Sequence, residues 1–257
     1  MTAFFRFPHT PHLAWLGPGK PRDDKVLSPR QVGELLESDV VVEEKVDGAN
    51  LGFSVDPDGR LLGQNRGSYL ELDAPQGQWK PLKRWLSTRR HALIDALGSQ
   101  LMLFGEWCYA VHSVHYRHLP DWFLAFDVYD RSTGAFWSVD RRNALAATLG
   151  IVTVPEFSRG RHSVETLKRL LGTSRVTDGP PEGLYIRREA NGLLQSRAKL
   201  VRAEFVQAIT DHWSKRQLVE NHVAQDPETG HAWRRTGPTS LGRSLAPASR
   251  RPPRPIV

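Results

Sequence analysis

The stretch that decides the fold reads Val40-Val41-Val42-Glu43-Glu44-Lys45-Val46-Asp47-Gly48-Ala49-Asn50-Leu51-Gly52-Phe53-Ser54-Val55. Its β-branched start predicts a strand that leads into Lys45, and the alternating apolar residues of 51–55 predict a second strand. The turn-forming residues of 56–59 then return the chain through 61–62 as a hairpin. The segment Lys45-Val46-Asp47-Gly48 can therefore present an amine beside a carboxylate and a flexible glycine.

The flanking sequence predicts further short strands, most of them joined by hairpins. Strands are expected at 101–105, 123–129, 136–139, 184–188 and 193–201. Helices are expected at 28–38, 79–97, 140–150, 163–172 and 204–221. The expected N-caps of three of these helices are Ser28, Asp140 and Ser163. Hairpin-linked strands with irregularly placed helices favour an antiparallel-rich α+β domain over a doubly wound parallel sheet.

Composition narrows the class of protein. The chain has 257 residues, of which 39% are hydrophobic and 25% charged, so it can build a core and is not wholly disordered. No apolar run approaches the ~18 residues of a membrane span, and the first six residues lack the apolar core of a signal peptide. A single cysteine, Cys108, cannot form an internal disulfide. These features predict a soluble, cytoplasmic protein.

The positive charge is concentrated at one end of the chain. Six of the 35 basic residues and none of the 28 acidic residues follow Glu228, so the net charge of +7 falls to +1 without that end. We expect a folded domain over 1–222 and a basic Pro/Arg-rich tail over 223–257 that stays disordered. The tail is either a solvated arm or a nonspecific binder of polyanions.

Taken alone, the Lys-x-Asp-Gly motif is also typical of a surface turn. Further motifs follow it in order, however: Gln64-Asn65-Arg66-Gly67, Phe104-Gly105-Glu106, Phe123-Leu124-Ala125-Phe126-Asp127-Val128, Glu182-Gly183-Leu184-Tyr185-Ile186 and Arg197-Ala198-Lys199. Over about residues 4–206 this series resembles the covalent nucleotidyltransferases, which include polynucleotide ligases and mRNA capping enzymes. The set looks closest to the ATP-dependent RNA ligases of the nick-sealing type, and the stretches 7–13, 112–116 and 119–120 also resemble that branch.

The resemblance implies a nucleotidyltransferase catalytic domain with two packed sheets and flanking helices, without an attached OB-fold domain. It also implies that Lys45 becomes linked to AMP and that the AMP is passed to an RNA 5′-phosphate before a 3′-hydroxyl joins the ends. The implied partners are ATP, Mg²⁺ or Mn²⁺, and RNA ends or a nicked RNA duplex. A lysine amine attacks only when it is neutral, so nearby positive charge has to favour its deprotonation.

The resemblance also assigns roles to individual residues. Lys45 matches the nucleophile, and Glu44 lies in the strand that helps to recognise adenine. Arg66 matches an arginine that contacts the nucleotide or an incoming phosphate, a role that suits a bidentate guanidinium. Glu106 matches a glutamate associated with the ribose, and Phe126 matches the aromatic residue that stacks on the base.

The remaining assignments concern metal and phosphate. Glu182 resembles the metal-binding glutamate, and the acidic residue Asp127 is a second candidate metal ligand, because hard oxygen ligands suit Mg²⁺ or Mn²⁺. Lys199 matches a cation for the α-phosphate. Many family members have two such lysines one residue apart, and here the second position is either Arg197 or Val201.

Other interpretations stay open. The residues Cys108, His112, His115 and His118 could be read as a zinc cluster, although structural zinc usually takes ligands from two separated segments. The basic flank around Arg89 and Arg90 is either a solvated face or an RNA contact. The alternative functions are a DNA ligase, a GTP-dependent capping enzyme, or a nucleic-acid-binding homologue that does not ligate.

Overall fold

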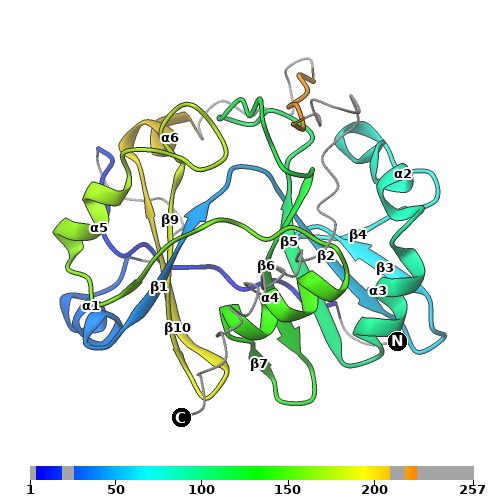
Figure 1. The fold of residues 1–257 in the computed structure, drawn as a ribbon, viewed down its shortest axis with the longest axis horizontal. Coiled ribbons are helices and arrows are strands. Elements are labelled where there is room, and N and C mark those ends of the chain that lie inside the picture. Colours follow the sequence, from blue (N-terminus) through cyan, green and yellow to red (C-terminus); the bar gives the residue numbers. More distant parts are fainter. Residues whose placement is uncertain (1–3, 19–25, 209–217, 225–257) are drawn as a thin grey trace, which may run out of the picture.

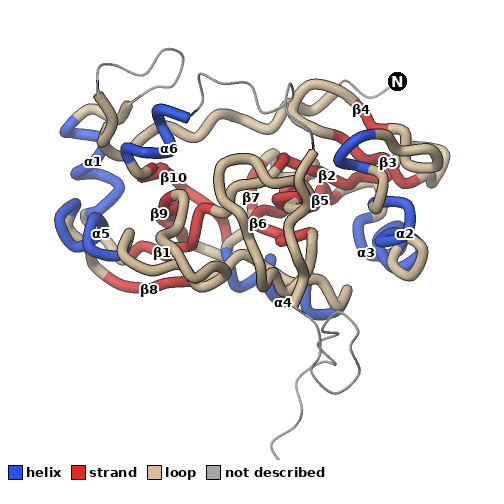
Figure 2. The backbone as a smooth tube through the Cα atoms, turned by 90° about the horizontal axis from the view of Figure 1, so that it is seen from above, coloured by secondary structure: helices blue, strands red, loops and turns tan. Residues whose placement is uncertain are grey.

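Two antiparallel sheets lie side by side in the structure, a computed structural model that describes residues 4–18, 26–208 and 218–224 (Figures 1 and 2). The first sheet has the order β10-β9-β1-β8, formed by Leu193–Val201, Gly183–Ala190, Val40–Lys45 and Glu156–Gly160. The second has the order β4-β3-β2-β5-β6-β7, formed by Tyr69–Leu70, Leu61–Gln64, Ala49–Val55, Leu101–Trp107, Phe123–Asp130 and Ala135–Phe136. Every ladder between these strands is antiparallel, which confirms the α+β prediction.

Two helices cover the first sheet. They are α1 (Pro29–Leu36) and α5 (Val164–Leu170), and they pack with Val42, Leu184 and Ile186 into one buried apolar cluster. The side chain of Ser28 accepts a hydrogen bond from Gln31 N while the Gln31 side chain accepts one from Ser28 N, so Ser28 is the N-cap, as predicted, and the two residues form a capping box.

The helices of the second sheet differ from the prediction. The stretch 79–97 is not one helix, because it divides into η1 (Gly77–Trp79), α2 (Leu82–Leu86) and α3 (Arg90–Leu97). The residues between α2 and α3 include Ser87 and Thr88, which are weak helix formers. Since both helices pack apolar residues into the same cluster on the second sheet, the spacing of apolar residues concealed the break.

Three other boundaries were also predicted wrongly. The helix α4 (Val139–Thr148) is capped by Ser138, whereas Asp140 lies in its first turn and pairs with Arg159. The last helix, α6 (Ala203–Ala208), does not continue to 221, because residues 218–224 form bridges to a distant loop instead. The strand expected at 136–139 covers only Ala135–Phe136. The division into 1–222 and 223–257 stays a prediction, since 225–257 lie outside the described residues.

The Lys-x-Asp-Gly segment carries the chain from one sheet to the other. The strand β1 ends at Lys45 in the first sheet, and β2 begins at Ala49 in the second. The glycine between them packs closely on β5, because a Cβ atom on Gly48 would lie 2.9 Å from the carbonyl oxygen of Trp107. Only glycine fits this approach, so Gly48 fixes how the motif spans the gap between the sheets.

Among the described residues, no helix combines the length and the apolar character needed to cross a bilayer.

Candidate active site

The motif residues converge on a cavity that both sheets line. It is partly open to solvent, and its empty space, with that solvent included, is about 620 Å³. Its lining comprises Phe7, His9, Thr10, Glu43, Glu44, Lys45, Val46, Arg66, Glu106, Phe126, Val154, Tyr185 and Lys199. Residues that are far apart in the sequence therefore meet around one space.

Lys45, on the wall of the cavity, forms a close ion pair with Glu182, a predicted site residue that is not itself among the lining residues. Their atoms Nζ and Oε2 are 2.5 Å apart, and both side chains are largely buried. Burial alone would lower the pKa of Lys45, but the carboxylates of Glu182 and Glu106 outweigh it and raise that pKa. Burial raises the pKa of Glu182 to about 7, against the opposing effect of Lys45. The free chain thus holds Lys45 as an ammonium ion, and its carboxylate neighbours are what keeps the proton there.

Glu106 adds a second buried carboxyl group. Burial raises its pKa to about 8, although Lys45 and Arg66 act in the opposite direction. Its Oε2 atom is buried and has no hydrogen-bond partner among the described residues. An unsatisfied buried carboxyl oxygen on a cavity wall is costly for folding and is a typical feature of a ligand site.

The loop after Lys45 is held by a second loop. The Oδ2 atom of Asp47 accepts hydrogen bonds from the backbone amides of Ser113 (2.6 Å) and Val114 (2.8 Å). The backbone amide of Asp47 donates to the hydroxyl oxygen of Tyr116 at 2.8 Å. Asp47 thereby fixes the conformation of the residues that follow the nucleophile candidate.

Aromatic side chains line the other part of the cavity. Phe126 comes from β6 and Tyr185 from β9, while the ring of Phe7 lies edge-on to Phe126 with 5.4 Å between centroids. Burial raises the pKa of Tyr185 to about 12, so its hydroxyl stays neutral, and it lies 3.3 Å from Thr10 Oγ1. The face of an aromatic ring such as Phe126 suits a nucleobase.

Glu44 and Lys199 both line the cavity, as predicted, but the two side chains differ in their surroundings. The carboxylate of Glu44 accepts hydrogen bonds from Ser174 Oγ and from the backbone amide of Arg175. Burial raises its pKa. Lys199 is fixed by its backbone, because it exchanges hydrogen bonds with Pro11 and Leu13 of the N-terminal segment.

Asp127 and Arg197 do not line the cavity, so the structure does not support their predicted roles. Asp127 is fully buried, with Oδ1 2.5 Å from Arg187 and Oδ2 2.9 Å from Arg197. Arg197 also lies over the rings of Phe7 and Phe136. A carboxylate with both oxygens on guanidinium groups is not available to a metal ion, and Arg197 is not aimed at a phosphate. Val201 is buried and uncharged, so Lys199 is the cation of this motif at the cavity.

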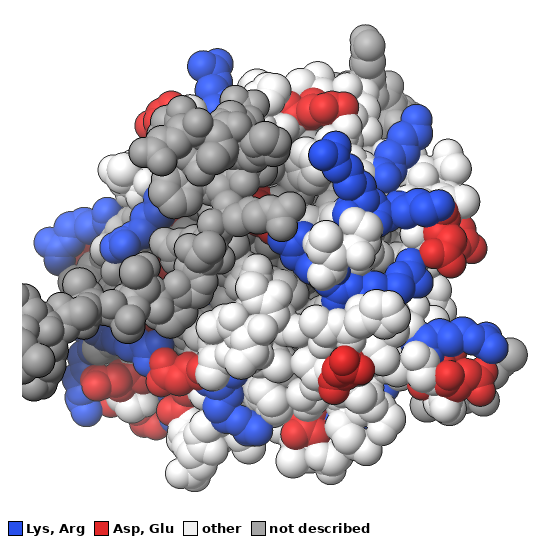
Figure 3. Space-filling view, turned by 45° about the vertical axis from the view of Figure 1, so that its right-hand side comes forward, with Lys and Arg blue, Asp and Glu red and all other residues white. Residues whose placement is uncertain are grey.

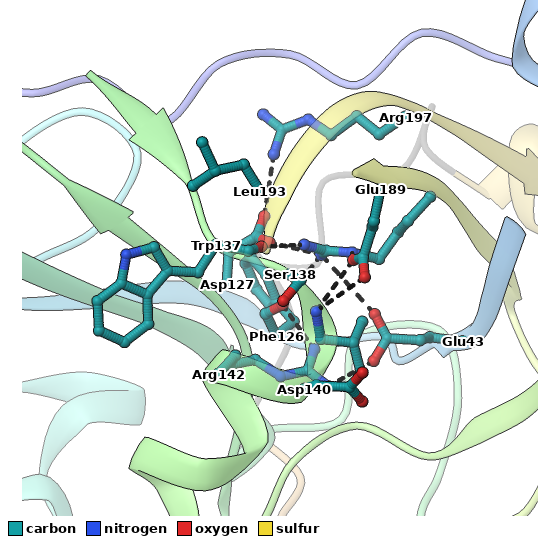
Figure 4. A network of polar contacts seen from close by, with 12 residues as sticks. Glu43, Phe126, Asp127, Trp137, Ser138, Asp140, Arg142, Glu189, Leu193 and Arg197 are labelled. Atoms are coloured by element: carbon teal, nitrogen blue, oxygen red, sulfur yellow. Dashed lines mark hydrogen bonds and ion pairs between the residues drawn. The ribbon is translucent and has the colours of Figure 1, made fainter. Parts of the chain in front are cut away.

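These two residues belong to a buried charged network that joins the sheets, shown in Figure 4. Arg142 of α4 lies 2.6 Å from Glu43 of β1, and Arg187 of β9 lies 2.5 Å from Asp127 of β6. Both arginines also donate to the backbone carbonyl of Phe126, at 2.7 and 3.2 Å. The network thereby fixes the backbone that carries the Phe126 ring.

The carboxyl groups at the cavity fit a divalent metal that also binds a substrate. Glu182 and the unsatisfied Glu106 supply hard oxygen donors, and Mg²⁺ commonly binds one or two carboxylates together with phosphates and water. Within the ranges that the structure describes, no group of three or more His, Cys, Asp and Glu side chains is arranged to hold a metal by itself. In the segment read as a zinc cluster, Cys108 is buried and His115 and His118 are exposed.

Several cavity residues do not stand out individually in the sequence. Phe7, His9 and Thr10 belong to a resembling stretch, and Tyr185 belongs to a motif, but none of the four carries a predicted role. The alternation in β9 could have identified Tyr185, because Leu184 and Ile186 enter the core and so turn Tyr185 to the other face. The N-terminal segment gives no such signal, since it is placed by long-range bonds to β10.

Comparisons with known proteins identify the family and the fold of this chain. The family model described as RNA ligase matches residues 38–201. No curated protein matches the chain in sequence. Among solved structures, the Naegleria gruberi RNA ligase with PPi has a TM-score of 0.55 and 19% identity, covering 82% of this chain and 65% of that chain.

Two mutants of the same Naegleria gruberi ligase are also similar. One, with ATP and Mn, has a TM-score of 0.53 and 20% identity, covering 71% of this chain and 55% of that chain. The other, with AMP and Mn, has a TM-score of 0.52 and 18% identity, covering 80% and 64%. The matched part of this chain thus corresponds to about 55–65% of the length of those structures. Because the family model covers more than half of the sequence, the chain belongs to the RNA ligase family.

Proposed function

We propose that this chain is an ATP-dependent RNA ligase that joins a 3′-hydroxyl and a 5′-phosphate through a lysyl-AMP intermediate on Lys45. The observation that carries the proposal is the placement of Lys45 on the wall of a cavity that also presents Arg66, Lys199 and the ring of Phe126. An amine, two cations and an aromatic ring suit the α-phosphate, the remaining phosphates and the base of ATP, respectively.

The chemistry of the first step follows from these groups. The Nζ atom of Lys45 attacks the α-phosphorus, the bond to the bridging oxygen breaks, and pyrophosphate leaves with that electron pair. Lys45 gives up a proton in this step, which its carboxylate neighbours oppose in the free chain. A divalent ion on Glu182 and Glu106 would neutralise those carboxylates and the triphosphate, which favours the neutral amine. Lys199 and Arg66 offset the charge that develops on the phosphates.

The next two steps use the same phosphorus chemistry. An oxygen of the RNA 5′-phosphate attacks the phosphorus of lysyl-AMP, the phosphorus–nitrogen bond breaks, and Lys45 regains a proton. The 3′-hydroxyl then attacks the phosphorus of the RNA 5′-phosphate, which forms the phosphodiester and releases AMP. Each step exchanges one bond to phosphorus for another, so no further energy source is required.

A basic surface on the second sheet's helices offers a place for the RNA backbone. Figure 3 shows Lys and Arg side chains gathered in the upper right part of this face. Lys80 follows η1, and Lys83 and Arg84 lie on α2; all three are exposed, and none forms an ion pair within the described part of the chain. We infer that these three residues, the basic surface of α2, contact RNA phosphates.

The neighbouring arginines are less available. Arg89 lies over the ring of Trp85 and pairs with Asp121 at 3.2 Å, and Arg90 pairs with Asp73 at 2.8 Å. The segment just before α2 contacts the loop that holds Asp47, because Gln78 of η1 lies 3.1 Å from His112, whose neighbours Ser113 and Val114 donate hydrogen bonds to Asp47.

Two measurements test the proposed function. Labelled ATP and labelled GTP are each incubated with the protein and Mg²⁺, and the denatured chain is analysed for covalent label. We expect one AMP from ATP and none from GTP; label from GTP alone would indicate a capping enzyme. The labelled chain is then mixed with nicked RNA, nicked DNA or single-stranded RNA. Sealing of RNA supports the proposal, whereas sealing of DNA alone would make the chain a DNA ligase.

A further inference from the structure

Residues 218–224 run along a loop that is far from them in sequence. This C-terminal strap, the orange segment at the top of Figure 1, lies beside the loop of 107–119. Five backbone hydrogen bonds of 2.8–3.0 Å join the two segments, and they are Val111 N to Val219 O, Asn221 N to Tyr109 O, His222 N to Tyr116 O, Leu119 N to His222 O, and Ala224 N to Leu119 O. Residues 111–118 contain no helix or strand, so the strap supplies backbone partners that the loop does not provide for itself.

Asn221 is the most tightly held side chain of the strap. Only 2% of the residue is exposed, whereas Leu218 and Val219 are 41% and 54% exposed. The Oδ1 atom accepts a hydrogen bond from the amide of Tyr116 at 2.7 Å. The Nδ2 atom donates to the carbonyl oxygens of Cys108 (2.9 Å) and Ala110 (3.1 Å). One amide group thus joins the two ends of the 108–116 loop.

The same loop supplies the groups that hold Asp47. The hydroxyl oxygen of Tyr116 accepts a hydrogen bond from Asp47 N, and the backbone amides of Ser113 and Val114 donate to the carboxylate of Asp47. Tyr116 is fully buried, so its hydroxyl position depends on the backbone around it. Two hydrogen bonds therefore connect Asn221 to Asp47, the first through Tyr116 N and the second through Tyr116 Oη.

We propose that Asn221 is a positioning residue for the transfer of AMP to Lys45, acting through Tyr116 and Asp47. This inference rests on the proposed function, because the readout is the formation of lysyl-AMP. The strap closes the loop, the loop holds Asp47, and Asp47 sets the course of the chain directly after Lys45. A misplacement of about 1 Å at a reacting group costs on the order of a hundredfold in rate, so a side chain that does not touch the nucleotide can affect the chemical step.

The test compares single-turnover AMP transfer in full-length variants at saturating ATP. We expect Asn221→Ala and Tyr116→Phe each to slow the transfer by about tenfold or more, with the ATP concentration for half-maximal rate changed less than threefold. The double variant should be no slower than the slower single variant, because both changes interrupt one path. Glu220→Ala is the matched control in the strap: it removes the hydrogen bond with Tyr109 and keeps Asn221, so it should react at the wild-type rate.

Other outcomes would overturn the proposal. A wild-type rate in Tyr116→Phe, or losses that multiply in the double variant, would show that Asn221 does not act through Tyr116. If Asn221→Ala does not fold, Tyr116→Phe carries the test alone. A wild-type chain that takes up no AMP would contradict the proposed function instead. In that case, hydrogen exchange tests whether the strap positions Asp47. Asn221→Ala should speed exchange at the amide of Asp47, and unchanged exchange there would refute the positioning.

Discussion

The cavity around Lys45 and the network around Arg187 are both buried and rich in charge, yet they differ in how their charges are satisfied. In the network, the carboxylates of Glu43 and Asp127 face guanidinium groups, and the arginines use their remaining donors on backbone carbonyls of Phe126 and Trp137. The Oε2 atom of Glu43, which also lines the cavity, has no hydrogen bond within the described part of the chain and lies 3.8 Å from Arg187. At the cavity, Glu106 keeps an oxygen without a partner among the described residues, and Glu182 shares a single lysine.

Pairing of the buried charges distinguishes a structural cluster from a reactive one. Burial of a charge costs several kcal/mol, and the network offsets this cost within the chain through paired groups. At the cavity, part of the free-energy cost of burying the carboxylates is not offset, and the raised pKa values of Glu106 and Glu182 reflect this. A ligand with phosphates and a divalent ion would complete the cavity, whereas each carboxylate of the network already has an arginine as its ion partner.

The largest effect is expected from removing the nucleophile. Lys45→Ala should abolish covalent labelling by ATP, because the proposed nucleophile is Lys45 Nζ; the variant also leaves Glu182 without its ion partner, so its folding is checked by its thermal midpoint. Mass spectrometry of the intact chain after exposure to ATP and Mg²⁺ measures the added AMP. Lys168→Ala, which removes an exposed lysine paired with Glu165, is the control and should label normally. Labelling that persists in Lys45→Ala would show that Lys45 is not the nucleophile and that the cavity around it is not the reactive cluster.

Breaking the network should damage stability. Asp127→Ala leaves Arg187 and Arg197 without their carboxylate, and removal of one partner of a buried ion pair costs about 3–5 kcal/mol. Urea denaturation measures the free energy of unfolding. Arg159→Ala removes a partly exposed arginine from two ion pairs and should cost about 1 kcal/mol or less. If the two variants lose the same stability, the network is not the structural cluster described here.

The unsatisfied carboxyl groups predict how stability depends on pH. The folded pKa of Glu106 is about 8, above the ordinary glutamate value of 4.5, so between these values the folded chain binds a proton that the unfolded chain has released. The free energy of unfolding should therefore fall as the pH rises through this window, by at most about 1.4 kcal/mol per pH unit for this one proton.

Glu106→Gln sharpens this prediction because it removes the titrating group and keeps its shape. The variant should show a shallower loss of stability from about pH 5 to about pH 8. Urea denaturation across this range, with a chelator present so that no metal ion occupies the carboxylates, measures the difference. Equal slopes in both proteins would place the pKa of Glu106 near its ordinary value.

The sequence predicts the structural features that depend on neighbouring residues. The strand before Lys45, the hairpin through Asn191 and Gly192, and the capping box of Ser28 are determined by neighbouring residues, and the structure has all three. The edge strand β8 was missed because its residues, Glu-Phe-Ser-Arg-Gly, show no apolar alternation. The convergence of the other motif residues on Lys45 follows from the resemblance, not from spacing.

Asp127 shows why the network could not be predicted. A buried acid beside an aromatic residue reads equally well as a metal ligand or as the partner of an arginine. Its partners Arg187 and Arg197 are 60 and 70 positions away, and only the pairing of β9 and β10 with each other and the packing of β6 bring them together. The strap is a similar case, because Asn221 lies 105 positions from Tyr116.

The smallest effect is expected from the basic surface of α2. Its exposed side chains differ from the charges of the cavity and of the network, because they have no ion partner among the described residues. Replacing Lys83 and Arg84 together by alanine should leave labelling by ATP unchanged and weaken binding to nicked RNA several-fold. The slope of log binding constant against log salt should also become shallower by about one for each phosphate that the variant no longer neutralises. Lys168→Ala again serves as control, since it removes one positive charge from a different helix. Unchanged RNA binding in the double variant would mean that RNA reaches Lys45 from another side, and that exposure without an ion partner does not by itself mark a binding surface on this fold.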